Sequence, residues 1–265
     1  LSSVGDILHR GGTVLKTARS ERFSTEEGVK RAKVILGTFG IDALVVIGGD
    51  GSMRGALELS KLGVNLMCLP GTIDNDLAYT DFTIGFDTAV NTVLDAISKV
   101  RDTSFAHERN TIIEVMGRHC GWLALMSGIS GGAEYILVPE EDFDLEEISN
   151  EIKEAYKKGK RYILVVVAEG AGSGIEVGNF IAEHTDIETR VSVLGHIQRG
   201  GTPSVIDRVK ASQLGEKAAL AILSGLSNVV FGFHRGNVVA IDLHDAVTNK
   251  KKLDPEYMRL AKVLA

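Results

Sequence analysis

Residues 41–76 read IDALVVIGGDGSMRGALELSKLGVNLMCLPGTIDND, and this stretch decides the fold. Its first apolar run, Ala43–Ile47, is rich in β-branched residues, which is typical of a strand buried on both faces. A glycine-rich turn, a helical stretch that opens near Ser52 and a second apolar run, Val64–Leu69, follow it. This order predicts a βαβ unit and hence an α/β fold with a parallel sheet.

The turn after the first run contains Gly48, Gly49, Gly51 and Gly55. Glycines let the backbone approach a ligand closely, and the N–H groups and positive dipole end of the next helix attract an anion. Many glycine turns only close a strand–helix connection, so the turn alone is a weak signal. We expect it to bind phosphate because of the acidic turn that follows.

That acidic turn, Pro70–Asp76, comes directly after the second strand and carries Asp74 and Asp76. Its carboxylates could simply cap a helix. Carboxylates beside a phosphate site, however, repel the ligand unless a metal or a proton transfer explains them. Phosphoryl transfer explains both features, with Asp50 suited to Mg²⁺ and Asp74 suited to taking a proton from the attacking hydroxyl.

The composition limits the classes of protein to consider. With 265 residues and 44% hydrophobic content, the chain can bury one large core or two smaller ones, and we expect two lobes. A formal net charge of −6 argues against a nucleic-acid partner. The two cysteines, Cys68 and Cys120, favour a reducing compartment over a disulfide framework. We see no signal peptide and no membrane-spanning run, so we expect a cytoplasmic protein without a membrane partner.

Strand, glycine turn and helix recur along the rest of the chain. We expect further strands over 111–115, 135–138, 162–167, 189–194, 229–233 and 238–242. We expect helices over 25–39, 87–100, 122–129, 144–157, 178–184 and 207–223, and a last one from 255. Arg101 and Asp102 are predicted to end the helix 87–100, with a loop from there to Asn110.

Five basic residues fall at predicted strand ends or in loops: Arg109, Arg118, Arg190, His196 and Arg199. Arginine binds phosphate oxygens bidentately, so their grouping indicates a phosphorylated substrate in addition to the phosphate donor. The alternatives remain open residue by residue. An exposed arginine is often only a solubilising charge, His196 could sit at a core edge, Glu169 could cap a helix, and Met116 could simply pack.

Four motifs make the chain resemble the bacterial-type ATP-dependent 6-phosphofructokinase family: IGGDGS (47–52), PGTIDND (70–76), MGRHCG (116–121) and LGHIQRGG (194–201). The resemblance runs from Gly11 almost to the C-terminus. It implies two Rossmann-like lobes with largely parallel sheets and flanking helices, and an active site in the cleft between them. The implied ATP-binding lobe is 1–85 plus 198–248, and the implied fructose 6-phosphate-binding lobe is 86–197 plus 249–265.

The resemblance also implies a reaction. A kinase of this family transfers the γ-phosphate of ATP to the 1-hydroxyl of fructose 6-phosphate, giving fructose 1,6-bisphosphate and ADP in glycolysis. By position, Asp74 is the implied general base, Asp50 the residue associated with Mg²⁺, and Thr72 and Arg118 the stabilisers of the transferring phosphoryl group.

Further residues match the family's binding positions. Those for ATP are Arg19, Gly49, Asp50, Gly51, Ser52 and Gly55. Those for fructose 6-phosphate are Thr72, Asp74, Asp76, Met116, Gly117, Arg118, Glu169, His196 and Arg199. Arg109 and Arg190 match arginines that reach the substrate from a neighbouring subunit, which implies a homotetramer.

An effector site between subunits is implied as well, at Arg101, Glu134, Lys158 and Lys160. ADP or a phosphoenolpyruvate-type effector would bind there in an allosteric enzyme. Tyr162 stands where some members carry histidine, so the identity of the effector stays open.

The phosphate donor can be read from two positions. Pyrophosphate-using relatives carry an acidic residue at the position of Gly51 and lysine at that of Gly71, so glycine at both favours ATP. The alternatives are a pyrophosphate-dependent phosphofructokinase or another sugar kinase, a non-catalytic subunit, and a dinucleotide oxidoreductase. A dinucleotide oxidoreductase would require a G-x-G-x-x-G turn. Asp50 inside the glycine turn suits a metal better than a dinucleotide pyrophosphate.

The sequence begins at Leu1, whereas family members begin with a strand and a Gly-Gly-Asp-Ala-Pro-Gly turn that cradles ATP phosphates. We therefore expect this sequence to be truncated at its N-terminus. A molecule that truly lacked that segment is expected to be inactive and poorly folded.

Overall fold

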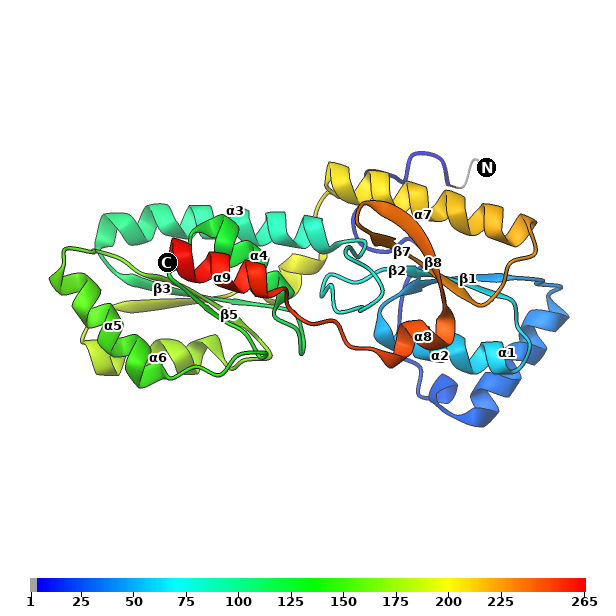
Figure 1. Cartoon of the computed structure of the whole chain (residues 1–265), viewed down its shortest axis with the longest axis horizontal. Coiled ribbons are helices and arrows are strands. Elements are labelled where there is room, and N and C mark those ends of the chain that lie inside the picture. The colour runs from blue at the N-terminus through cyan, green and yellow to red at the C-terminus, as the bar shows by residue number, and fades with distance from the viewer. Residues whose placement is uncertain (1–3) are drawn as a thin grey trace. The chain divides into compact units, whose positions relative to one another are not determined.

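The computed structural model describes residues 4–265 and divides into two compact units (Figure 1). Unit 1 takes the chain up to Phe86 together with Thr202–Lys251, and unit 2 takes Asp87–Gly201 together with Lys252–Ala265. Each unit has its own four-stranded sheet with helices on both faces. The α/β class, with largely parallel sheets and flanking helices, is confirmed. The assignment of one unit to ATP and the other to fructose 6-phosphate stays a prediction.

Unit 1 contains η2 (Arg22–Ser24), α1 (Glu26–Thr38), β1 (Leu44–Gly48), α2 (Asp50–Lys61), β2 (Leu66–Pro70), α7 (Val205–Leu223), β7 (Val229–His234), β8 (Asn237–Asp242) and α8 (Leu243–Thr248). Its sheet has the order β1-β2-β7-β8. The strands β1, β2 and β7 are parallel, and β8 returns antiparallel to β7. The carboxyl ends of β1 and β2 therefore lie at the same edge of the sheet.

Strand β2 is buried along its whole length because helices cover both faces of its sheet. Figure 1 shows α7 along one face and α1, α2 and α8 along the other. Successive side chains alternate between two apolar clusters: Cys68 packs on the side of α2 and α8, whereas Met67 and Leu69 pack on the side of α7. The continuous apolar run in the sequence is thus the signature of a strand with two covered faces.

Unit 2 contains α3 (Phe86–His107), β3 (Asn110–Val115), α4 (Trp122–Gly131), β4 (Tyr135–Leu137), α5 (Leu145–Lys157), β5 (Leu164–Ala168), α6 (Gly174–Thr185), β6 (Thr189–Val193), η3 (Gly195–Arg199) and α9 (Pro255–Leu264). The sheet has the order β4-β5-β3-β6, and all its pairings are parallel. The helices α3, α4 and α9 lie on one face, and α5 and α6 on the other (Figure 1). All the turns that follow these strands consequently open at one edge.

One expected helix end is wrong, one expected helix start differs by two residues, and one helix was not expected. Helix α3 continues past Arg101 to His107, because Ser104 bonds to Thr111 and the ring of Phe105 packs on Tyr162 with centroids 6.0 Å apart. Helix α2 begins at Asp50 rather than near Ser52. The short helix α8 was not predicted at all. Along residues 4–265, none of the helices combines the length and apolarity that crossing a membrane requires.

Candidate active site

The N-terminus of α2 is open to an anion. Gly49 is the N-cap residue, and no side chain caps the helix. The backbone N–H groups of Ser52 and Met53 bond back to the Gly49 carbonyl at 3.0 and 3.1 Å. A Cβ atom placed on Gly51 would meet nothing within 4 Å, so the first turn of the helix faces free space. The helix dipole favours a negatively charged group at this position.

Glycines bring the acidic turn against this helix N-terminus. Gly48 of β1 pairs in register with Pro70 of β2, and the Gly71 N–H donates to the Gly48 carbonyl at 2.9 Å. A Cβ on Gly49 would lie 3.3 Å from the Cβ of Thr72, so the two turns touch. The structure therefore places Thr72 beside the predicted phosphate turn, within unit 1.

Side chains of the acidic turn shape its own backbone. The Asp74 N–H donates to the Thr72 hydroxyl at 3.2 Å. Asn75 is buried, has a φ of 51°, and donates from its side-chain amide to the Asp81 carbonyl at 3.4 Å. Asp74 and Asp76 are half-buried, and no helix begins until α3. The alternative that this turn caps a helix is therefore wrong.

Asp50 is already paired with a neighbour on α2. The Arg54 Nε donates to both of its carboxylate oxygens, at 2.9 and 3.1 Å. This bond and the negative charge of Asp50 raise the pKa of Arg54 above its usual value. The Asp50 side chain is 41% exposed, so it remains accessible to solvent and to ligands. A cation that binds Asp50 would compete with Arg54.

The oxygen atoms around the two turns fit a magnesium ion. Mg²⁺ prefers one or two carboxylates together with substrate phosphates and water, rather than a closed cage of protein ligands. Asp50 and the carboxylates of the acidic turn offer such donors. The buried Tyr79 hydroxyl, which bonds to no group among residues 4–265, lies within electrostatic reach of Asp50 and Asp76. Burial is the main cause that raises the pKa of Tyr79, followed by the charge of Cys68 and then by those two carboxylates.

A different group of side chains comes close enough to share one ion. Among the described residues, only Asp242, His244 and Asp245 offer three ligand atoms within 4.8 Å of one another. The Asp242 carboxylate there accepts hydrogen bonds from the backbone N–H groups of His244 and Asp245, as the N-cap of α8. Helix capping explains this group without a metal.

Two further residues predicted to bind ATP, Arg19 and Gly55, are not part of the two turns. Arg19 is exposed in the irregular segment before η2. Gly55 lies one turn into α2, where an added Cβ would come within 2.9 Å of the Phe23 ring. The packing of η2 on α2 accounts for glycine at this position.

In unit 2, parallel pairing gathers three polar turns at one sheet edge. Val115, the last residue of β3, pairs with Ala168 of β5, and Glu114 pairs with Val193 of β6. The Glu169 N–H donates to the Val115 carbonyl at 2.8 Å. The turn 116–121, Glu169 and η3 therefore lie together. Six residues predicted to bind the sugar phosphate share this edge: Met116, Gly117, Arg118, Glu169, His196 and Arg199.

The turn after β3 needs unusual backbone conformations. Gly117 has a φ of 141°, and a Cβ there would overlap the Cys120 carbonyl. Arg118 has a φ of 56°, and its backbone N–H donates to the Glu169 carboxylate at 2.7 Å. A Cβ on Gly170 would overlap the Arg118 carbonyl. This packing holds the turn and leaves the Arg118 side chain exposed.

Sequence reasoning missed two residues that hold this edge together. The side chain of Gln198, in η3, bonds to the Met116 N–H and to the Gly195 carbonyl. The Glu140 carboxylate accepts the Gly121 N–H through both oxygens, at 2.9 and 3.0 Å. Gln198 lies inside the motif LGHIQRGG, between the predicted site residues His196 and Arg199. This position in the sequence could have indicated a role for Gln198 in the site. No sequence signal links Glu140 to Gly121.

Arg109 and Arg190 do not join these turns. Arg109 precedes β3 and Arg190 is the second residue of β6, so both lie at the amino ends of their strands. They share one partner, because Glu188 Oε1 lies 3.0 Å from Arg109 and 2.5 Å from Arg190. The expected grouping of five basic residues is therefore wrong within one copy of the chain. Strand β3, of six residues, separates the two sets by roughly 17–20 Å.

Three of the four predicted effector residues lie near the amino ends of β4 and β5. The Lys160 ammonium lies 2.6 Å from the Glu134 carboxylate, which also accepts the Leu164 N–H at 2.7 Å. Arg101 donates to the Gly132 carbonyl at 3.4 Å.

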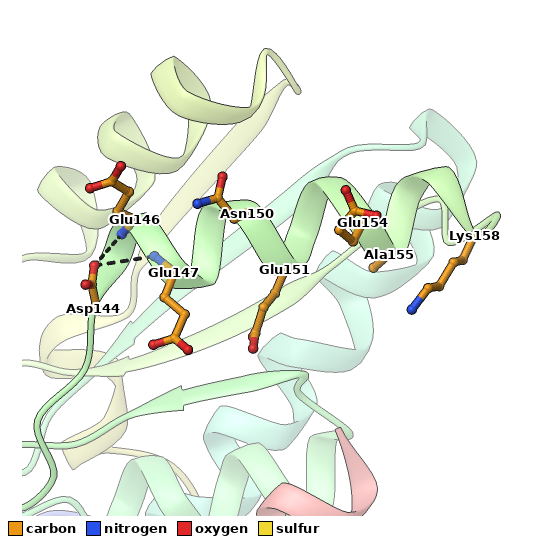
Figure 2. A pocket seen from close by; sticks show the side chains of 8 residues that line it. All are labelled: Asp144, Glu146, Glu147, Asn150, Glu151, Glu154, Ala155 and Lys158. Carbon is orange, nitrogen blue, oxygen red and sulfur yellow. Dashed lines mark hydrogen bonds between the residues drawn. The ribbon is translucent and has the colours of Figure 1, made fainter.

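The fourth predicted effector residue, Lys158, lines an open hollow of about 680 Å³ along α5 (Figure 2). Its other lining residues are Asp144, Glu146, Glu147, Asn150, Glu151, Glu154 and Ala155. Five carboxylates against one lysine disfavour a phosphate group in this hollow. One of the acids, Asp144, is already in use as the N-cap of α5.

Comparisons with known proteins place the chain among its relatives. The family described as Phosphofructokinase matches residues 1–222. The ATP-dependent 6-phosphofructokinase of Clostridium novyi (strain NT) is 55% identical over 263 residues, which are 99% of this chain and 82% of that protein. A protein of the same name from Clostridium botulinum (strain Hall / ATCC 3502 / NCTC 13319 / Type A) is 52% identical with the same coverage.

Solved structures agree with these relatives. A phosphofructokinase from Saccharomyces cerevisiae matches with a TM-score of 0.85 and 35% identity, over 93% of this chain and 38% of that one. A pyrophosphate-dependent phosphofructokinase from Marinobacter aquaeolei matches with a TM-score of 0.86 and 21% identity, over 99% and 77%. The second match shows the fold alone.

Proposed function

The chain belongs to the phosphofructokinase family, and we propose that it transfers the γ-phosphoryl group of ATP to the 1-hydroxyl of fructose 6-phosphate. The products are fructose 1,6-bisphosphate and ADP, as in glycolysis. The observation that carries the proposal is the contact between Gly49, at the N-terminus of α2, and Thr72 in the acidic turn. Relatives that are 52–55% identical and named ATP-dependent 6-phosphofructokinase support it.

Unit 1 supplies the donor side of the reaction. The N–H groups at the start of α2, around Gly49, Gly51 and Ser52, attract the phosphates of ATP. Asp50 and the acidic turn would hold Mg²⁺, and that ion would neutralise negative charge on the phosphate oxygens of ATP. Arg19 and Gly55 complete the proposed ATP contacts.

Asp74 is the proposed general base. Asp74 is half-buried, and its backbone N–H donates to the Thr72 hydroxyl. Its carboxylate can accept the proton of the attacking 1-hydroxyl as the new P–O bond forms. The Thr72 hydroxyl and the Arg118 guanidinium stabilise charge on the transferring phosphoryl group. The role of the protein is then mainly positioning and charge neutralisation.

Unit 2 supplies the acceptor side. The turn 116–118, Glu169, His196 and Arg199 hold the sugar phosphate, and Asp76 remains a further proposed sugar-phosphate residue. Arg109 and Arg190 lie too far along the sheet to join these turns in the same copy, which supports their use by a neighbouring copy. We therefore propose a homotetramer in which these two arginines complete the site of another subunit.

Regulation and location are part of the same proposal. Arg101, Glu134 and Lys160, with Lys158 nearby in sequence, bind an effector of the ADP or phosphoenolpyruvate type. Cys68 and Cys120 are buried and are not joined in a disulfide. This suits a reducing compartment, and we place the enzyme in the cytoplasm.

A donor-resolved assay tests the function. Purified protein is incubated with fructose 6-phosphate, Mg²⁺ and either ATP or pyrophosphate, and fructose 1,6-bisphosphate is quantified. We expect product with ATP and Mg²⁺, and none with ATP after chelation of Mg²⁺. Turnover with pyrophosphate alone would overturn the assignment of the donor, and absence of product with both donors would overturn the function.

A further inference from the structure

We propose that Gln198 is a positioning residue that locks two sugar-phosphate turns of unit 2 to each other. It lies in η3 and is only 1% exposed, between the exposed residues His196 and Arg199. Its side chain therefore points into unit 2 while its neighbours face solvent. The inference rests on the proposed function, because that function defines what the two turns bind.

Both ends of the Gln198 side-chain amide are in use. Its Oε1 accepts the Met116 backbone N–H at 3.1 Å, and its Nε2 donates to the Gly195 carbonyl at 2.9 Å. One bond reaches the turn after β3, and the other stays within η3. A single buried amide thus joins segments that are about 80 residues apart in the sequence.

These bonds matter because η3 is short, and the chain enters it through one backbone bond, from the Leu194 N–H to the Glu114 carbonyl. It is a five-residue 3-10 helix without a side-chain N-cap, and it ends at Gly200 in an extended conformation. Short 3-10 helices have poor internal hydrogen-bond geometry, so they depend on outside contacts. The direction in which His196 and Arg199 project consequently depends on Gln198.

The same amide fixes the other turn at its first residue. Met116 leads into Gly117 and Arg118, which have φ angles of 141° and 56°. Glu169 holds the Arg118 N–H, and Gln198 holds the Met116 N–H. Without Gln198 the turn would be anchored at only one of these points, and the buried Met116 N–H would lose its partner.

The consequence is specific to the sugar phosphate. Both hydrogen bonds of the Gln198 side chain stay within unit 2, whereas all residues of the proposed ATP site belong to unit 1. Loss of its bonds should weaken binding of fructose 6-phosphate and leave binding of ATP unchanged. A purely structural role would lower stability without separating the two substrates.

The test compares three variants of the full chain. Gln198→Met keeps the length of the side chain and removes both bonds, and Gln198→Glu keeps an acceptor for the Met116 N–H. Ser127→Ala is the matched control, because Ser127 is a buried polar residue of unit 2 whose hydroxyl bonds only within α4. Steady-state KM values for both substrates, thermal midpoints and amide exchange at Met116–Arg118 are measured for each.

For Gln198→Met we expect the KM for fructose 6-phosphate to rise roughly tenfold. We also expect an unchanged KM for ATP and faster amide exchange at Met116. Gln198→Glu should recover part of both effects. Ser127→Ala should change neither the KM for fructose 6-phosphate nor the exchange at Met116, although its thermal midpoint falls by a similar amount. Equal changes in both KM values, or unchanged exchange at Met116 in Gln198→Met, would overturn the proposal.

The exchange measurement also separates the two hypotheses. If the wild-type protein does not phosphorylate fructose 6-phosphate, the proposed function fails on that assay alone. Faster exchange at Met116 in Gln198→Met would then still support the lock between the turns, and unchanged exchange would contradict it.

Discussion

The Glu169 carboxylate accepts a 2.7 Å hydrogen bond from the backbone N–H of Arg118, a residue with a φ of 56°. A non-glycine residue in this left-handed region carries a strain of order 1–3 kcal/mol, which persists only when neighbouring contacts hold it. A carboxylate acceptor makes a stronger bond to an N–H group than a neutral one does. Glu169 therefore keeps Arg118 in the conformation that presents its side chain.

Replacement of Glu169 by alanine should release this turn. We expect kcat/KM for fructose 6-phosphate to fall roughly 10- to 100-fold, because Arg118 loses its fixed position. Glu169→Gln retains an acceptor oxygen and should lose less. Steady-state kinetics of the two variants decide the matter, and an alanine variant with wild-type kcat/KM would show that Glu169 does not hold Arg118 for catalysis.

The role of Asp74 as general base predicts a defect in turnover. Asp74→Asn keeps the size of the side chain and its backbone bond to Thr72, but it cannot accept the proton of the 1-hydroxyl. We expect kcat to fall by about 10²–10⁴-fold with little change in either KM. Asp42→Asn, at an exposed position before β1, is the control and should behave as wild type. A normal kcat in Asp74→Asn would remove Asp74 from this role.

Much of the fold was predictable because its signals are local. The apolar runs of β1 and β2 and the glycine turn between them define one βαβ unit, and this pattern needs no knowledge of the rest of the chain. The closeness of Thr72 to Gly49 follows from parallel pairing of those strands. The position of Asp50 in the first turn of α2 would also have predicted its i, i+4 partner Arg54.

The remainder depended on contacts between distant residues. Helix α3 passes Arg101 because Ser104 and Phe105 find partners beyond its end, and no local pattern shows this. Arg109 lies before β3 and Arg118 lies after it, so the two arginines are at opposite ends of this strand. Grouping residues at strand ends from the sequence does not distinguish the amino end from the carboxyl end. The role of Gln198 requires a partner about 80 residues away, which spacing in the sequence cannot supply.

Buried tyrosines predict a loss of stability at alkaline pH. Burial is the main cause that raises the pKa of Tyr156 to about 12, from 10.0. Its hydroxyl donates to Asn110 at 2.9 Å. Since the folded state holds this proton more tightly than the unfolded state does, the stabilisation is complete below pH 10 and is lost as the pH rises from 10 towards 12. Tyr135 shifts in the same direction, again mainly through burial.

Urea unfolding at pH 7 to 12 measures this effect. We expect the free energy of unfolding of the wild type to fall above pH 10, and Tyr156→Phe to show a shallower fall. The variant should also be about 1 kcal/mol less stable at pH 7, because Asn110 loses a hydrogen bond. Tyr257→Phe, which alters a ring packed on Trp122, is the control. Identical pH profiles for wild type and Tyr156→Phe would contradict the assignment.

The two glycines that favour ATP predict different outcomes when they are replaced. A Cβ on Gly51 would meet nothing within 4 Å, so Gly51→Asp should fold normally. Its carboxylate at the start of α2 would repel the phosphates of ATP and occupy the space for the nucleotide. A Cβ on Gly71 would lie 3.0 Å from Ile47 and 3.3 Å from the Gly48 nitrogen. Gly71→Lys should therefore lose about 1 kcal/mol of stability through overpacking.

Kinetics with ATP and pyrophosphate, together with thermal midpoints, separate these effects. We expect Gly51→Asp to raise the KM for ATP at least tenfold without lowering the thermal midpoint. Gly51→Ala is the matched control, because it adds the Cβ without the charge and removes a glycine from a helix. It should gain up to about 1 kcal/mol of stability and lose less affinity for ATP than Gly51→Asp does. If Gly51→Asp binds ATP as well as Gly51→Ala, charge at this position does not select the donor, and the N-terminus of α2 is not where ATP phosphates bind.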